Sequence, residues 1–296
     1  MSAGVDTLTA TVVFSLANVF LARGARSKSM RDAVRLSIYI GVIFFFLLVI
    51  FSGQMRALSW ESLFLFTLSG VLHFAVGRSA MYEAISLLGA SRALVFIALS
   101  PVFSLVLAVT LFHEYLAPVA ICGALLAISG PIIASRREVS SPVARIEKSL
   151  YSRGVVLALV AAVCWGVSPI LIKKGLENGA PILLGAFISH AAAAITIILC
   201  DVHDGRMRVH RKIFKFRYVY SVFVVAAVLT NLGQYLLYRA LDAGDITTYV
   251  VLLQLTPIFT TILTLIVNKQ VERVSIKVVG GGLLAVAGSI LVVSVR

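Results

Sequence analysis

The sequence predicts an all-α integral membrane protein in which ten transmembrane helices form two inverted five-helix repeats. Three observations support this fold class. The 296-residue chain is 60% apolar before glycine is counted. Uncharged segments long enough to cross a bilayer recur along its whole length. The same short motifs return after a constant interval of 156 residues.

The apolar content separates this chain from soluble proteins. Soluble domains reach about 45–50% apolar residues with glycine included, and the mean hydropathy here is +1.01. Ten spans of about 20 residues each leave only short loops. We therefore expect no soluble domain and no enzymatic activity.

Each span is assigned because it is mostly uncharged over the length that crosses a hydrocarbon core of about 30 Å. The first segment is expected to stay as a span and not to be a secretory signal, because residues 1–7 contain no Lys or Arg and no convincing cleavage site follows. In chain order the spans are residues 5–22, 36–53, 61–82, 92–112, 117–135, 154–172, 181–200, 218–238, 246–267 and 274–294.

Two blocks of matching residues carry the repeat. In the first, Gly77-x-x-x-x-Tyr82-x-Ala84 and the later Pro-x-Phe at Pro101 return 156 residues further on. In the second block, which begins with Glu114 and its match Glu272, the interval is 158. Five spans per half is an odd number, so the second half must insert upside down. The predicted repeats are 1–138 and 150–296, with a short linker between them.

The net charge of +13 does not indicate a nucleic-acid partner, because the Lys and Arg residues lie in loops between spans. Their distribution instead predicts how the chain is oriented in the membrane. Twenty Lys and Arg residues follow odd-numbered spans, and five lie on the opposite side. The positive-inside rule then places both termini outside the cell membrane. The expected partners are the lipid bilayer and a small-molecule substrate.

Longer stretches around these motifs carry a family resemblance. They are Gly77-Arg-Ser-Ala-Met-Tyr82-Glu-Ala-Ile, Leu88-Gly-Ala-Ser-Arg-Ala93, Pro101-Val-Phe103 and Phe112-His-Glu114, with Cys164-Trp165-Gly166 in the sixth span. They resemble the EamA branch of the drug/metabolite transporter superfamily, and the likeness covers both halves. The resemblance implies a transporter whose termini are both cytoplasmic, opposite to the charge count, so both orientations stay open.

Polar side chains inside the spans are the candidate substrate-binding residues, because hydrocarbon disfavours each of them unless it faces protein or water. In the eighth span Thr230, Gln234 and Tyr238 are spaced i, i+4, i+8, and Asn231 lies alongside them. The repeat matches Gln234 with Arg78 and Tyr238 with Tyr82. The third and eighth spans are therefore predicted to face one central volume.

The fourth and ninth spans show a similar pattern. Ser100 and Ser104 match Thr256 and Thr260, and Gln254 lies just before the second proline. Such hydroxyls often bond back to their own helix, which is the alternative to a substrate role. Pro101 and Pro257 each free a carbonyl about four residues earlier, so they are predicted hinges, together with Pro169 of the sixth span.

Five further residues have individual interpretations. Arg78 is a candidate anchor for a carboxylate or phosphate, with an ion pair to Glu83 or snorkelling to the cytoplasmic face as alternatives. His73 and His190 could couple protons or could be buried, neutral and hydrogen-bonded. Asn18 and Trp165 are predicted to shape the cavity, with packing as the alternative for the tryptophan. Ser168 completes the predicted binding set.

Several classes of site are not expected. No Asp or Glu lies near the middle of a span, which disfavours antiport of a cationic drug against protons. Neither the three cysteines nor the segment from Asp201 to Asp204 has the spacing of a metal site, so no metal and no cofactor is predicted. The chain also lacks a nucleotide-binding loop, which excludes direct ATP drive.

These observations predict an alternating-access exporter of a small polar metabolite such as an amino acid or organic anion. Spans one, three, four, six, eight and nine would enclose a midplane cavity, and spans five and ten would brace the halves through small residues. A channel and a non-transporting membrane scaffold are the alternatives. An intramembrane enzyme is disfavoured because neither His73 nor His190 has an obvious catalytic partner.

Overall fold

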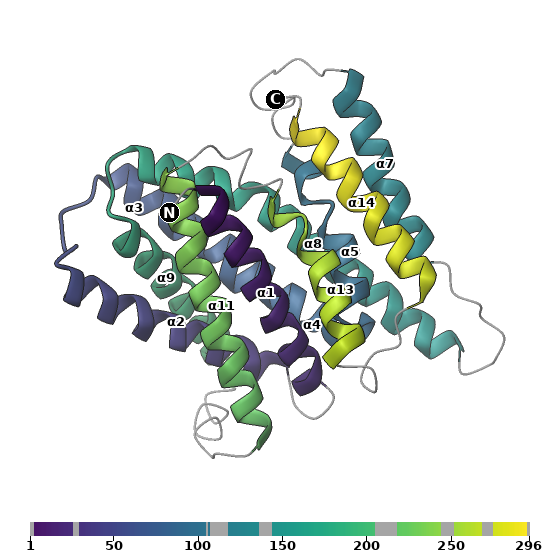
Figure 1. The fold of residues 1–296 in the computed structure, drawn as a ribbon. Helices are drawn as coiled ribbons and strands as arrows, with labels where there is room; N and C mark the ends of the chain where they lie inside the picture. The colour runs from purple at the N-terminus through teal and green to yellow at the C-terminus, as the bar shows by residue number, and fades with distance from the viewer. Residues whose placement is uncertain are drawn as a thin grey trace.

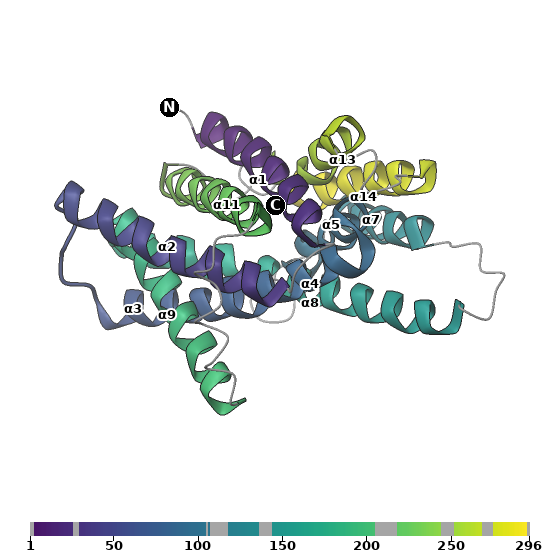
Figure 2. The same ribbon diagram turned by 90° about the horizontal axis from the view of Figure 1, so that it is seen from below.

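The computed structural model describes residues 3–25, 30–104, 106, 118–135, 144–204, 218–243, 252–267 and 275–294. The regular elements in these ranges are all helices (Figures 1 and 2). They are α1 (Ala3–Ala25), α2 (Met30–Ser52), α3 (Trp60–Gly70), the π-helix η1 (Val71–Arg78), α4 (Ser79–Leu88), α5 (Ala90–Ile97), α7 (Pro118–Ser135), α8 (Ala144–Glu177), α9 (Ile182–His203), α11 (Tyr218–Ala243), α13 (Thr256–Val267) and α14 (Ile276–Ser294).

The protein is a multi-pass membrane protein. Six helical segments of the described chain are long and apolar enough to cross a bilayer, and they correspond to predicted spans one, two, three, six, seven and eight. The other four predicted spans overlap shorter apolar helices of 10–17 residues. Parts of the predicted fourth and ninth spans lie outside the described residues, so the count of ten stays a prediction.

Each of the six long helical segments extends beyond at least one of its predicted ends. Helix α2 begins at Met30, six residues before the predicted start, and α8 runs through Lys173 and Lys174 to Glu177. In α2 this places Arg35 inside the helix and not in a loop as the charge count assumed. Arg35 is buried there because Asp201 of α9 accepts hydrogen bonds from its guanidinium, with Nε to Oδ2 at 2.7 Å.

The third span is one continuous helical segment with a change of winding in the middle. It runs from Trp60 to Leu88, and residues 71–78 are wound as a π-helix. This wider winding is rare and is frequently found at functional sites. Here it contains two of the predicted site residues, His73 and Arg78. At Gly89, where φ is 84°, the chain turns into α5, a backbone angle that glycine adopts without strain.

Helices α7 and α14, in the predicted fifth and tenth spans, pack side by side through glycines (Figures 1 and 2). A Cβ added to Gly123 would lie 2.8 Å from the Gly288 carbonyl oxygen, and one added to Gly130 would lie 2.3 Å from that of Gly281. In the repeat, Gly123 matches Gly281 and Gly130 matches Gly288. The contact of Gly123 with Gly288 is therefore the repeat equivalent of the contact of Gly281 with Gly130. Such reciprocal contacts are those of two elements related by a two-fold axis.

The remaining helices pair across the halves in the same way. Helix α1 of the first half lies along α11 of the second (Figures 1 and 2). The contact that matches it in the repeat is that of α8, from the second half, with α3, η1 and α4 of the first. Helices α2 and α9 pack on each other. An ion pair between the buried Asp6 of α1 and the partly exposed Arg239 of α11, with Oδ2 and Nη2 3.2 Å apart, adds a second charge contact between the halves. The two halves are thus interleaved and share one interior.

Candidate functional site

Two helices of the interior are broken at matching positions. The helical winding stops at Ala98 and Leu99 and resumes at Ser100, and it stops again at Gln254 and Leu255 before Thr256. These breaks are 156 residues apart, the interval of the repeat, and a proline follows each of them. The missing donor of a proline prevents a continuous hydrogen-bond ladder. The prolines are predicted to free carbonyls about four residues earlier, near Ile97 and Leu253. The two breaks come directly after these residues, in agreement with that prediction.

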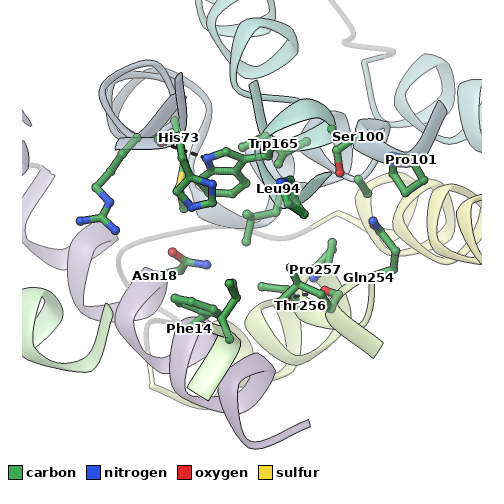
Figure 3. A pocket seen from close by; sticks show the side chains of 18 of the residues that line it. Phe14, Asn18, His73, Leu94, Ser100, Pro101, Trp165, Gln254, Thr256 and Pro257 are labelled. Atoms are coloured by element: carbon green, nitrogen blue, oxygen red, sulfur yellow. Dashed lines mark hydrogen bonds between the residues drawn. The ribbon is translucent and has the colours of Figure 1, made fainter. Parts of the chain in front are cut away.

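A cavity of about 130 Å³ lies between the halves beside these breaks (Figure 3). It is lined from α1, η1, α4, α5, residues 100–104, α8, α11 and residues 253–257, which are the six predicted spans, with one contribution from α14. In Figure 3, Phe14 and Asn18 of α1 lie opposite His73 and Trp165, while Ser100 and Gln254 lie toward one end.

Fourteen of the predicted site and hinge residues line this cavity. They are Asn18, His73, Arg78, Tyr82, Ser100, Pro101, Ser104, Trp165, Pro169, Thr230, Gln234, Gln254, Thr256 and Pro257. The other five, Ser168, His190, Asn231, Tyr238 and Thr260, are buried and are not part of the lining. A substrate contact for any of these residues remains a prediction.

His73 is held by residues from two other helices. Its Nδ1 lies 2.6 Å from Ser168 Oγ of α8, and its Nε2 lies 3.1 Å from Gln234 Nε2 of α11. With the Gln234 amide in this orientation, its nitrogen donates to His73 Nε2, which leaves the proton on Nδ1 toward Ser168. Trp165 stacks on the imidazole with ring centres 5.4 Å apart, and its Nε1 donates to the His73 carbonyl oxygen. This geometry fits the buried, neutral, hydrogen-bonded alternative for His73.

Arg78 is buried on the same side of the cavity. Its Nη1 donates to Ser37 Oγ of α2 at 3.0 Å, and its guanidinium lies over the Phe74 ring at 4.5 Å from the ring centre. Glu83 pairs instead with Arg153 at 3.3 Å, and Arg78 is only 2% exposed. Both alternatives considered from the sequence, an ion pair with Glu83 and snorkelling, therefore do not apply to this structure.

Ser37 is a functional neighbour that sequence reasoning missed. Its Oγ accepts from Arg78 and lies 3.4 Å from the Tyr82 hydroxyl, and its carbonyl oxygen accepts from Asn231 Nδ2 at 2.9 Å. Ser37 thus joins α2, α4 and α11 behind the cavity. A single serine near the start of an apolar segment gives no pattern that would distinguish it in the sequence.

Two predicted residues belong to a second buried cluster behind the cavity. The Tyr238 hydroxyl donates to Ser189 Oγ at 2.9 Å. His190 packs between the Phe45 and Phe74 rings, with its Nδ1 2.8 Å from the Ala186 carbonyl oxygen. These contacts account for both residues as packed interior groups. Tyr238 therefore differs from Tyr82, its match in the repeat, which lines the cavity.

The Ser and Thr hydroxyls are predicted from the sequence either to contact substrate or to bond back to their own helix, and their hydrogen bonds in the structure differ. Thr230 donates to the Ala226 carbonyl oxygen of its own helix at 2.7 Å. Thr256 donates at 2.6 Å to the Leu253 carbonyl oxygen, which lies on the other side of the break at residues 254–255. Ser104 donates across to the Gly166 carbonyl oxygen of α8 at 2.6 Å and, at the longer distance of 3.3 Å, to the Ser100 carbonyl oxygen of its own segment. Gly166 permits this approach, since an added Cβ would lie 2.7 Å from the Ser100 carbonyl oxygen.

The described residues contain no group of three or more His, Cys, Asp or Glu side chains that could hold a metal ion.

Helix α8 continues through Pro169 without a break. Its predicted hinge role therefore differs from that of Pro101 and Pro257, which follow interrupted winding.

Comparison with known proteins gives the family. A model of the EamA-like transporter family matches residues 5–136 and 152–294. The chain belongs to the EamA-like transporter family. The two matched ranges of this EamA-like protein are its two halves, and each of them lines the cavity.

The EamA-like chain also resembles solved structures. One, titled "Crystal structure of protein", is 16% identical, and the similarity covers 98% of this chain and 95% of that one with a TM-score of 0.65. At this identity the likeness concerns the fold alone. No curated protein matches the chain in a sequence search.

Proposed function

We propose that this protein is a secondary carrier that moves a small polar metabolite, such as an amino acid or organic anion, across the cell membrane by alternating access. Membership of a transporter family supports transport in general. The observation that carries the more specific proposal is the cavity between the halves, lined by polar groups of both and placed beside two helix breaks that match in the repeat.

The proposed mechanism is a rocking of one half against the other around this cavity. Ten spans in two inverted five-helix repeats, 1–138 and 150–296, would provide the two bodies. The crossed glycine contacts of α7 and α14 support this arrangement. Pro101 and Pro257 would absorb the change in backbone angle, and the polar residues of the cavity lining would contact the solute.

Flux in proteoliposomes tests the carrier function. Metabolites that raise the melting temperature of the purified protein would be offered as labelled solutes to vesicles preloaded with unlabelled solute. A carrier gives uptake that saturates and counterflow that exceeds equilibrium. Flux that rises linearly with concentration and shows no counterflow would indicate a channel, and no flux of any stabilising solute would indicate a scaffold.

We further propose that both termini lie outside the cell membrane, as the distribution of Lys and Arg favours. A cysteine placed after Arg296 in a chain without its three native cysteines would test this orientation. An impermeant maleimide added to intact cells should label it. Protection in intact cells, with labelling only after lysis, would show cytoplasmic termini.

A further inference from the structure

Arg78 is a buried positive charge whose described neighbours are neutral. Its hydrogen-bond partner is the Ser37 hydroxyl, and the face of its guanidinium rests on the Phe74 ring. Its Nη2 atom is buried and has no hydrogen-bond partner in the described structure. Because guanidinium stays protonated in proteins, Arg78 cannot escape this burial by losing its charge.

The acidic side chains that the structure describes are placed elsewhere. Asp32 and Asp201 hold Arg35, Asp6 pairs with Arg239, and Glu83 pairs with Arg153. Glu177 pairs with Lys173, and Glu61, Asp204 and Asp242 are exposed. None of these carboxylates contacts Arg78. A buried charge without a counter-ion is strongly unfavourable, so a position of this kind favours binding of an anion.

A second unpaired polar atom belongs to another residue of the cavity lining. Gln234 occupies the position that matches Arg78 in the repeat, and its Nε2 is engaged by His73. Its Oε1 is buried and has no partner among the described residues. Exchanging the amide oxygen and nitrogen would still leave one of the two without a partner. The cavity lining therefore includes a charged residue from one half and an amide residue from the other, each with a buried polar atom that has no partner among the described residues.

The rest of the lining is largely apolar. Phe14, Leu94, Ile97, Leu253 and Val292 contribute hydrocarbon surface, and Trp165 contributes a ring. Such surface suits an apolar ligand body, while the few polar groups fix its orientation. The second half has Gln234 where the first has Arg78, so the site carries charge on one side only.

We propose that Arg78 binds the anionic group of the substrate, and that the substrate is a small organic acid with an apolar body whose N–H or O–H group pairs with Gln234. This inference rests on the proposed carrier function, since it names the solute class for that same cavity. The acid supplies the counter-ion that the described residues do not provide to Arg78.

Trp165 offers a direct reporter of binding. The chain has two tryptophans, and Trp60 is exposed and outside the cavity, so Trp60→Phe leaves Trp165 as the only one. Its fluorescence would be titrated with 4-methylpentanoate, 4-methylpentanamide and 3-methylbutylamine, which share an apolar body and differ in charge. We expect saturable binding of the acid, with the amide and the amine weaker by about tenfold or more.

The anchoring residue is tested in the same background. Arg78→Gln places in the first half the residue that the second half carries, and it should abolish the preference for the acid over the amide. Arg153→Gln, which removes an exposed arginine outside the cavity, is the matched control and should retain the preference. If Arg78→Gln does not fold, the three probes on the parent protein still decide the question.

The outcomes separate this inference from the carrier function. Equal affinity for acid and amide, no response to the acid, or an unchanged preference in a folded Arg78→Gln variant would overturn the role of Arg78. Saturable counterflow of other solutes in the same preparation would then leave the carrier function standing. Acid binding that depends on Arg78, without counterflow of any bound acid, would support the anchor and contradict the carrier.

Discussion

At the scale of single residues, the two buried arginines of the first half have opposite environments. Arg35 is held by Asp201 and Asp32, with Arg35 Nη1 and Asp32 Oδ1 3.1 Å apart. Arg78 has a serine and a phenyl ring as neighbours. A paired buried charge contributes to stability mainly because losing its partner is so unfavourable. We therefore expect Arg35 to stabilise the α2–α9 contact, whereas ligand binding is the role we propose for Arg78.

Asp201→Asn should destabilise the protein, because it leaves the buried Arg35 guanidinium with only Asp32 as a charged neighbour. We expect the free energy of unfolding to fall by about 3 kcal/mol, measured by SDS titration in mixed micelles and followed by circular dichroism. Glu177→Gln, in an exposed pair, should change it by less than about 1 kcal/mol. Equal effects of the two substitutions would show that the buried pair has no special role.

The polar residues of the interior could be predicted from the sequence, but not all of their partners. The spacing in the eighth span placed Thr230 and Gln234 on the cavity, because helical periodicity alone determines which residues share a face. It could not separate them from Tyr238, whose hydroxyl points to Ser189. The choice between cavity and packed interior depends on contacts between distant helices, such as those of Ser37, that no local pattern specifies.

At the scale of helices, small residues and prolines determine how the elements meet and where they bend. The sequence predicted the close faces of α7 and α14 and the breaks before Pro101 and Pro257, since glycine and proline act through local geometry. It did not predict the π-helix of residues 71–78, which has no comparable residue signature. Helix α2 began earlier than predicted because Asp201 stabilises the buried Arg35 within it.

Gly288→Ala should weaken the contact of α7 with α14. The added Cβ would lie 2.2 Å from the Ala127 backbone nitrogen, whereas one added to Gly280 of the same helix would meet nothing within 4 Å. Both substitutions raise helix propensity equally, so their difference reports the contact. We expect Gly288→Ala to be less stable than Gly280→Ala by about 1–3 kcal/mol in SDS titrations. Equal stability would mean that the two helices do not approach closely.

Pro101→Ala with Pro257→Ala should slow transport more than it weakens binding. Restoring the two donors favours continuous helices through residues 98–99 and 254–255, which would stiffen the proposed hinges. We expect the maximal rate of counterflow to fall by about tenfold or more, with solute affinity from thermal shifts changed by less than about threefold. Pro181→Ala, at the start of α9 and outside the cavity, is the control. An unchanged rate in the double variant would argue against hinges at these positions.

At the scale of the whole molecule, the internal repeat explains why one cavity forms between the halves. Matching helices carry matching polar positions, and the two-fold pattern of contacts brings those positions to a shared interior. The sequence predicted this arrangement because a repeat in a membrane chain constrains topology as well as fold. The asymmetry of the cavity, with Arg78 on one side and Gln234 on the other, is a departure from the repeat that would orient a polar solute.

Two-sided accessibility of the cavity is the most direct test of the central claim. Ser104 lines the cavity, and Ser104→Cys in a chain without native cysteines would be exposed to an impermeant maleimide in right-side-out and in inside-out vesicles. Alternating access predicts labelling from each face, slowed in both cases by a transported solute. Labelling from one face only, with or without solute, would contradict the account.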